Sequence, residues 1–193
     1  MKDNQHDIFS TPIWGFILND QQYQSQDYID YILAMAKKEP SQKKSNFGGW
    51  QSRDNIHETE GIFREFTSGL NRIANNIFYD VSKIHKDRVT DGQYVEVEDM
   101  WVNVNGKYCS NGAHTHSGIL SGVFYLQTPK NSGRLMLINP AVRADGHFIR
   151  VSNYPIVPEK LACIMFPSWL EHYVEPNLSD ELRISISFNI GVK

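Results

Sequence analysis

The sequence predicts an α+β protein that is mainly β: an antiparallel sandwich or jelly roll preceded by helices. Up to about residue 91, apolar residues recur at three- and four-residue spacing, which is typical of amphipathic helices. From residue 92 onward, short segments of alternating apolar and polar residues are separated by Gly, Pro and Asn turn signals. Helices followed by many short antiparallel strands indicate this fold class.

Length and composition favour one domain over residues 1–193, with a helical part (1–91) and a β core (92–193). Hydrophobic residues make up 40% of the chain, enough for a sizeable core. A net charge of −3 argues against a nucleic-acid partner. The polar start of the chain and the lack of a long apolar run predict a cytoplasmic protein without a membrane segment, in the host cytoplasm if a phage encodes it.

The helical part is expected to begin with a strand over 8–18, interrupted by Pro12. Helices are predicted over 21–38 and 59–79, the second with a broad apolar face that must pack on another element. The polar stretch 40–57 between them predicts a long loop. There Trp50 and Arg53 either border a substrate cleft or anchor the loop.

The β core is expected to contain seven strands, over 94–105, 121–127, 134–139, 147–152, 161–166, 172–176 and 182–190. In the last of these, Arg183, Ser185, Ser187 and Asn189 alternate with apolar residues. The polar face lies either in water or inside the barrel, and in the second case the two helices cover the apolar face. Inside, Arg183 would bind a carboxylate through a bidentate pair, and the Ser185 hydroxyl would add a hydrogen bond.

A metal site is predicted from His114, His116 and His172. Residues i and i+2 of an extended segment face the same way, so His114 and His116 can share one ion. A third ligand from a distant strand closes a triangular face, which suits non-haem Fe(II). The usual triad has two histidines and one carboxylate. A carboxylate from Glu171, Asp145 or Glu175 is therefore the alternative, with one histidine outside the coordination sphere.

These motifs resemble the signature of the Fe(II)/2-oxoglutarate-dependent oxygenases, and more closely that of a family of such oxygenases from bacteria and phages. The segments that carry the resemblance are GGWQS (48–52), NGAHTH (111–116), LSGVFYL (120–126), SGRLML (132–137), FPSWLEHYVEPN (166–177) and RISISFN (183–189). The resemblance is densest from residue 101 to 190. It implies a double-stranded β-helix (jelly-roll, cupin-like) core with the N-terminal helices packed on one sheet.

The resemblance also implies roles for single residues. His114, His116 and His172 would bind Fe(II), and Arg183, assisted by Ser185, would bind the C5 carboxylate of 2-oxoglutarate. Asn103 would lie near this cosubstrate, and Tyr125 would reach the same carboxylate or else be an ordinary aromatic residue of the sheet.

The implied enzyme is a 2-oxoglutarate-dependent dioxygenase. It would hydroxylate a C–H bond of a further substrate, with release of succinate and CO2 and with ascorbate as an assay additive. Its partners would be 2-oxoglutarate and O2. Both a monomer and a homodimer are compatible with the sequence. The alternatives are a cupin-like three-histidine dioxygenase that does not use 2-oxoglutarate, and a non-catalytic metal-binding jelly-roll protein.

Overall fold

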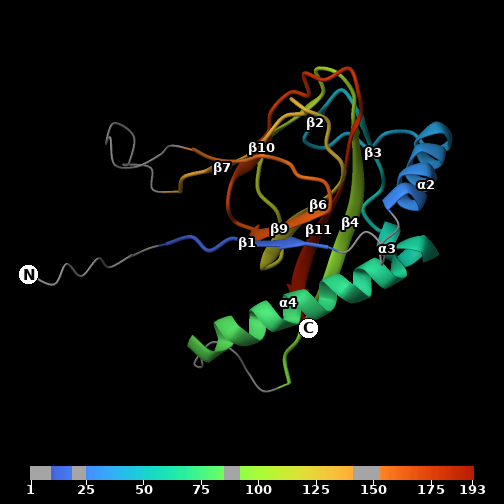
Figure 1. The fold of residues 1–193 in the computed structure, drawn as a ribbon. Coiled ribbons are helices and arrows are strands. Elements are labelled where there is room, and N and C mark those ends of the chain that lie inside the picture. The colour runs from blue at the N-terminus through green and yellow to red at the C-terminus, as the bar shows by residue number, and fades with distance from the viewer. Residues whose placement is uncertain (1–9, 19–24, 85–91, 141–152) are drawn as a thin grey trace, which may run out of the picture.

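The structure is a computed structural model and describes residues 10–18, 25–84, 92–140 and 153–193 (Figure 1). Its N-terminal part contains β1 (Trp14–Ile17), α2 (Ser25–Lys38), β2 (Asn46–Phe47), β3 (Trp50–Gln51), α3 (Ile56–Thr59), the 3-10 helix η1 (Gly61–Phe63) and α4 (Arg64–Ile84). Its C-terminal part contains β4 (Val95–Asn105), β5 (Ser110–His114), β6 (Leu120–Gln127), β7 (Leu135–Ile138), β8 (Asn153–Ile156), β9 (Ala162–Pro167), β10 (His172–Val174) and β11 (Arg183–Val192).

The strands form two antiparallel sheets, as the alternating sequence pattern predicts. The larger sheet has the order β1-β9-β6-β11-β4-β3, and the smaller has the order β2-β5-β10-β7-β8. Apolar side chains from both sheets, including Tyr125, Leu137 and Phe166, pack together in one cluster. The two sheets therefore face each other as the layers of a jelly roll.

The two long helices cover the outer face of the larger sheet. Ile184, Ile186, Phe188 and Ile190 of β11 lie in one buried cluster with apolar residues of α2 and α4, among them Ile32 and Phe66. Figure 1 shows α4 running across the strands of this sheet. Because these helices bury the apolar face of β11, its polar face points between the two sheets.

Helix α4 also provides hydrogen-bond partners for backbone groups of β4. It does so at the N-terminal end of this strand, beyond the two residues that pair with β3. The Asn75 amide accepts a hydrogen bond from the Val95 N–H (3.0 Å) and donates one to the Val95 carbonyl (2.6 Å). Asn71 Oδ1 accepts from the Val97 N–H (2.9 Å). These bonds occupy backbone groups that an edge strand would otherwise leave open.

The stretch 40–57 differs from the predicted loop, because it contributes a strand to each sheet. β2 pairs with β5 in the smaller sheet, and β3 pairs with β4 in the larger. Gly48 and Gly49 join them, both at φ +67. A Cβ on Gly49 would lie 2.7 Å from Asn105 Oδ1 and 3.0 Å from the Val104 carbonyl oxygen. The chain therefore needs glycine there both for its backbone conformation and for its close approach to β4.

Other boundaries also differ from the prediction. The helix expected over 59–79 is divided into α3, η1 and α4, and α4 continues to Ile84. β5 was not predicted as a strand of its own, since Ser110, Asn111 and Gly112 look like turn residues. The strand expected over 147–152 lies outside the described residues, which resume at β8.

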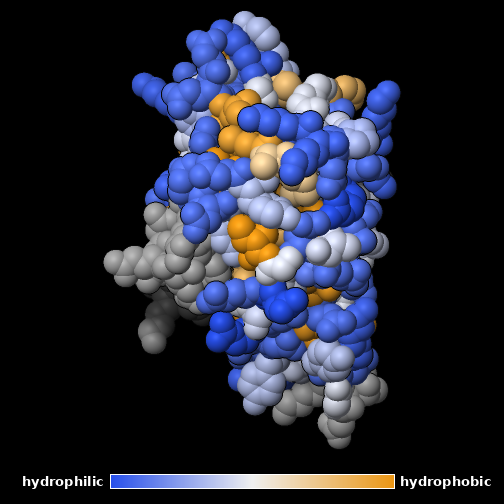
Figure 2. Space-filling view, turned by 90° about the vertical axis from the view of Figure 1, so that its right-hand side faces the viewer, coloured by the Kyte–Doolittle hydropathy of each residue, from blue (hydrophilic) through white to orange (hydrophobic). Residues whose placement is uncertain are grey.

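The face that lies on the right of Figure 1 is mainly hydrophilic, and its hydrophobic residues form separate groups (Figure 2). Among the residues that the structure describes, no helix is long and apolar enough to cross a membrane.

The packing of β6 on β11 predicts that Gly122→Ala destabilises the protein. Gly122 lies directly opposite Phe188, and a Cβ there would lie 2.4 Å from Phe188 Cζ and 2.9 Å from the Ile164 carbonyl oxygen. Overpacking of this kind costs about 1–3 kcal/mol. Urea unfolding should show the loss. In the control Gly61→Ala, where the added methyl meets no described atom within 4 Å, stability should stay within about 0.5 kcal/mol of the wild type. Equal stabilities of the two variants would contradict the packing argument.

Candidate metal and cosubstrate site

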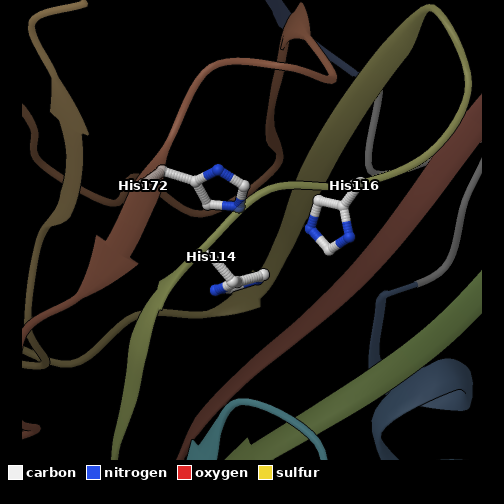
Figure 3. A group of neighbouring side chains, drawn as sticks. All are labelled: His114, His116 and His172. Atoms are coloured by element: carbon white, nitrogen blue, oxygen red, sulfur yellow. The ribbon is translucent and has the colours of Figure 1, made fainter.

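Three histidines meet between the two sheets (Figure 3). His114 ends β5 and lies directly opposite His172 of β10, while His116 follows two residues after the end of β5. One nitrogen from each ring lies within 4.8 Å of the others. The ring centroids are 4.7 Å apart for His114 and His116, 4.5 Å for His114 and His172, and 5.1 Å for His116 and His172. Such a cluster can present three imidazole nitrogens to one metal ion.

Backbone carbonyls orient two of the rings. His114 Nδ1 lies 2.6 Å from the Gly112 carbonyl oxygen, and His172 Nδ1 lies 2.8 Å from the Leu170 carbonyl oxygen. A proton on Nδ1 donates to each carbonyl and leaves Nε2 with a free lone pair. Metal-binding histidines are commonly fixed in this way by a bond from the second ring nitrogen.

The environment keeps two of the imidazoles neutral. Burial, with smaller contributions from His114 and His172, lowers the pKa of His116 to about 3. Burial likewise lowers the pKa of His172 to about 4, although the bond to the Leu170 carbonyl opposes this shift. Both rings are therefore unprotonated at neutral pH, as metal binding requires.

Beside the histidines, the predicted cosubstrate residues form a row across three strands. Ser185 of β11 lies opposite Asn103 of β4 on one side and opposite Tyr125 of β6 on the other. Arg183, two residues before Ser185, is on the same face, and its Nη1 donates to the Ser185 hydroxyl (3.3 Å). These four residues and the three histidines line one chamber.

Several polar atoms in this chamber are buried without a partner among the described residues. They are the Tyr125 hydroxyl, Arg183 Nε and Asn103 Oδ1. Arg183 is 2% exposed, and no described carboxylate pairs with it. Its guanidinium carbon lies 5.2 Å from the centre of the Tyr125 ring. Because an unpaired buried charge is costly, this arrangement suits an anionic ligand that supplies the missing acceptors.

Burial also shifts the pKa values of the pair that lines this end of the chamber. It raises the pKa of Tyr125, against the opposing charge of Arg183, so the hydroxyl keeps its proton and is a donor. It lowers the pKa of Arg183, which nonetheless stays charged at neutral pH. Both side chains therefore offer N–H or O–H groups to an acceptor.

Two of the three carboxylate alternatives to a histidine ligand, Glu171 and Glu175, do not join the cluster. Glu175 is occupied by Arg134 (2.6 Å), and Glu171 is exposed. Asp145 lies outside the described residues. Among the residues that the structure describes, the group that could hold a metal ion consists of the three histidines alone.

Two residues expected at a substrate cleft do not line the cavities at the histidines. Trp50 Nε1 donates to the Glu39 carbonyl (2.9 Å), and Arg53 binds the carboxylates of Glu39 and Glu60. They anchor the segment 40–60, which was the second interpretation of this loop. Lys44, Ser45, Phe47, Gln51 and Asp54 of this segment line the cavity beside the histidines instead.

Sequence reasoning missed Asp99, Trp101 and Gln51, which line the same cavity. For Asp99 and Trp101, the signal was available: they lie at two-residue spacing before Asn103 and therefore share its face of β4. For Gln51, no local signal existed, because β3 is only two residues long.

Known proteins share both the sequence signature and the fold. Residues 99–189 match a family model described as "Putative 2OG-Fe(II) oxygenase". Among curated proteins, no relative matches the sequence.

Solved structures share the architecture at low sequence identity. The α-ketoglutarate-dependent epimerase SnoN from nogalamycin biosynthesis is 12% identical (TM-score 0.67), over 93% of this chain and 78% of its own. A Pseudomonas putida prolyl-4-hydroxylase is 12% identical (TM-score 0.63), over 93% of both chains. HygX from Streptomyces hygroscopicus, solved with nickel and 2-oxoglutarate, is 9% identical (TM-score 0.61), over 94% of this chain and 83% of its own. The predicted double-stranded β-helix core is thereby confirmed.

The lowered pKa of His172 predicts a loss of stability in acid for the metal-free protein. Between its unfolded value of 6.5 and its folded value of about 4, the unfolded chain takes up a proton that the folded protein does not. The free energy of unfolding therefore falls as pH decreases through this window. In His172→Asn, this decrease should be smaller by on the order of 1–3 kcal/mol. Urea unfolding in EDTA at pH 7 and pH 4.5 measures the difference, with each variant's value at pH 7 as its reference. An equal decrease in both proteins would contradict the assignment.

Proposed function

We propose how the residues of this chain, which matches the 2OG-Fe(II) oxygenase family model over residues 99–189, divide the work of a 2-oxoglutarate-dependent non-haem iron oxygenase. His114, His116 and His172 bind Fe(II). Arg183 binds the C5 carboxylate of 2-oxoglutarate, with help from Ser185, Tyr125 and Asn103. The reaction is the hydroxylation of a C–H bond in a further substrate, with release of succinate and CO2.

The observation that carries this proposal is the buried, unpaired Arg183 in the same chamber as the three histidines. A carboxylate at Arg183 would accept from Arg183 Nε and from the Tyr125 hydroxyl, which both lack an acceptor among the described residues. A dianionic cosubstrate would also offset the charge of an iron held only by neutral ligands. The donor set of three imidazoles suits Fe(II).

When bound, the iron supplies the redox chemistry that activates oxygen. The chain's own residues bind and orient the reactants. The Gly112 and Leu170 carbonyls hold two imidazoles in one tautomer, which would leave Nε2 free to bind the ion. Arg183 and Tyr125 hold the far end of the cosubstrate, and the surrounding apolar residues Val123, Leu135 and Phe166 limit the access of water.

The two alternatives account for less of this arrangement. A cupin-like dioxygenase without 2-oxoglutarate has no use for a buried arginine beside the metal. A non-catalytic jelly roll has no use for unpaired donors that face a chamber. A cytoplasmic location, a homodimer, the absence of a nucleic-acid partner and the benefit of ascorbate in assays stay predictions from the sequence.

Succinate formation tests the proposal. Arg183→Met should retain iron but lose most 2-oxoglutarate turnover, because the charge that binds the cosubstrate is gone. Loss of a buried charged partner corresponds to a factor of about 100 or more in affinity. His172→Ala should lose iron, measured by metal analysis after anaerobic loading. Arg134→Met, at an exposed arginine paired with Glu175, is the control that should keep both properties. A wild type that forms no succinate would favour the dioxygenase that does not use 2-oxoglutarate, and full turnover in Arg183→Met would overturn the role of Arg183. Unchanged iron content in His172→Ala would overturn the metal assignment.

Tyr125→Phe should separate stability from cosubstrate binding. The substitution removes a buried hydroxyl that has no partner among the described residues of the ligand-free protein, so stability should stay equal or rise by about 1 kcal/mol. Affinity for 2-oxoglutarate should fall about 3- to 10-fold, because the hydroxyl donates only when the cosubstrate is present. Urea unfolding and calorimetric titration measure the two quantities. A loss of stability with unchanged affinity would show that Tyr125 is an ordinary residue of the sheet.

A further inference from the structure

A second, larger cavity adjoins the histidines on the side away from Arg183. It has a volume of about 600 Å³, a size typical of sites for small metabolites. The segment 44–54, the inner face of β4, the end of β5 and Asn189 line it, together with His114 and His116. His114 and His116 line this cavity as well as the chamber that holds Arg183. A substrate in the cavity would therefore lie next to the metal site.

Asp99 lies on the inner face of the large sheet at this cavity. It faces Asn189 of β11, which in turn faces Ser121 of β6. Asn189 Nδ2 donates to Asp99 Oδ2 (3.0 Å), and Ser121 Oγ donates to Asn189 Oδ1 (2.9 Å). These bonds fix one oxygen of the carboxylate and leave the other for a ligand.

The charge of Asp99 is not neutralised within the described part of the chain. Its neighbours on β4, Glu96 and Glu98, both lie near Lys193 Nζ (3.9 and 3.1 Å), whereas no described Lys, Arg or His pairs with Asp99. Burial lowers the pKa of nearby His57, so this imidazole is uncharged at neutral pH and does not offset the carboxylate. Lys44 and Asp54, also on the cavity wall, are exposed and carry opposite charges. The cavity therefore has an excess of one negative charge.

Gln51 provides an independent sign of a polar ligand. It is 5% exposed, lies opposite Asn103 in the register of β3 and β4, and lines the cavity. Its side-chain amide has no hydrogen bond to any described residue. Because Gln51 lines the cavity, its amide can bond to a polar group of a ligand bound there.

Trp101 lies between Asp99 and Asn103 on the same face, and its ring centroid is 5.3 Å from that of His116. An aromatic ring beside a carboxylate is a favourable environment for an ammonium or guanidinium group. We propose that the substrate oxidised by this enzyme carries such a cationic group, which binds to Asp99 beside Trp101, while Gln51 contacts another polar group of the same substrate. This inference rests on the proposed function, since it assigns the substrate class of the same site.

The spacing of the rows fits this assignment. Asn103, in the cosubstrate row, and Asp99 are four residues apart on β4, roughly 13 Å along the strand. Trp101 and the adjoining His116 lie between them. The anion of the cosubstrate and the cation of the substrate would thus bind at opposite ends of one surface, with the metal ligands over its middle.

Matched probes test the proposal: butylguanidinium and its neutral near-isostere butylurea. The protein is first loaded with Zn(II), as a redox-inert substitute for iron, and with 2-oxoglutarate, and loading is measured for every variant. Titration is followed by NMR through the indole N–H signals of the four tryptophans, with Trp101→Phe to assign the signal of Trp101. Butylguanidinium should bind about tenfold tighter than butylurea, as expected for one charge-assisted contact.

Asp99→Asn should abolish this preference. Glu65→Gln, which makes the same charge change at an exposed position of α4, should retain the preference. Equal affinities of both probes for the wild type would overturn the proposal. A second result would also overturn it: Asp99→Asn loses zinc, but the fraction of this variant that still binds zinc keeps its preference for butylguanidinium. Asp99 would then contribute to metal binding and not to recognition of the cation. If the wild type loads neither zinc nor 2-oxoglutarate, the proposed function itself has failed, and this is known before any probe is added.

Discussion

The site depends on one strand that is buried on both of its faces. β11 lies between β4 and β6, so both of its edges are hydrogen-bonded. Its apolar residues pack under α2 and α4, and its alternate residues face the smaller sheet. A slip of one residue in register would move Arg183 and Ser185 into the helix interface and the isoleucines into the chamber. The helices therefore serve the chemistry indirectly, because they fix which face of β11 points inward.

The inner face keeps polar groups that the fold itself does not satisfy. Within the described parts of the chain, Tyr125, Asn103 and Arg183 all have buried atoms without a partner, whereas Ser121 and Asn189, further along the same strands, bond to each other. An unpaired buried donor lowers stability, and one that a ligand satisfies contributes to binding. The ligand-free protein is thus less stable than its packing allows, and a cosubstrate bound at these groups would recover the difference. Such a cost at a functional site is common in enzymes.

The sequence predicted those features that depend on alternation along one strand. The division of β11 into two faces, the covering helices and the pairing of His114 with a distant histidine all follow from the two-residue period and from local residue types. Features that depend on contacts between distant segments were missed. β2 and β3 are two residues long, and their positions are set by the close approach of Gly49 to Asn105, which no local pattern reveals. Gln51 enters the cavity only through that approach, and for the same reason Trp50 and Arg53 turn toward Glu39.

Three rows of side chains across β4, β11 and β6 give the inner face its order. Asn103, Ser185 and Tyr125 form the first row, Trp101, Ser187 and Val123 the second, and Asp99, Asn189 and Ser121 the third. Because backbone hydrogen bonds hold all three strands, the distances between the rows are fixed by the sheet and do not depend on loops. Sites built on strands are more precise than sites built on loops. The segment 44–54 adds a wall to the cavity. The relative positions of Arg183, the Trp101 ring and the Asp99 carboxylate, however, are determined by the sheet. The sheet can therefore select ligands by the distance between two charged groups, because it fixes the distance between Arg183 and Asp99.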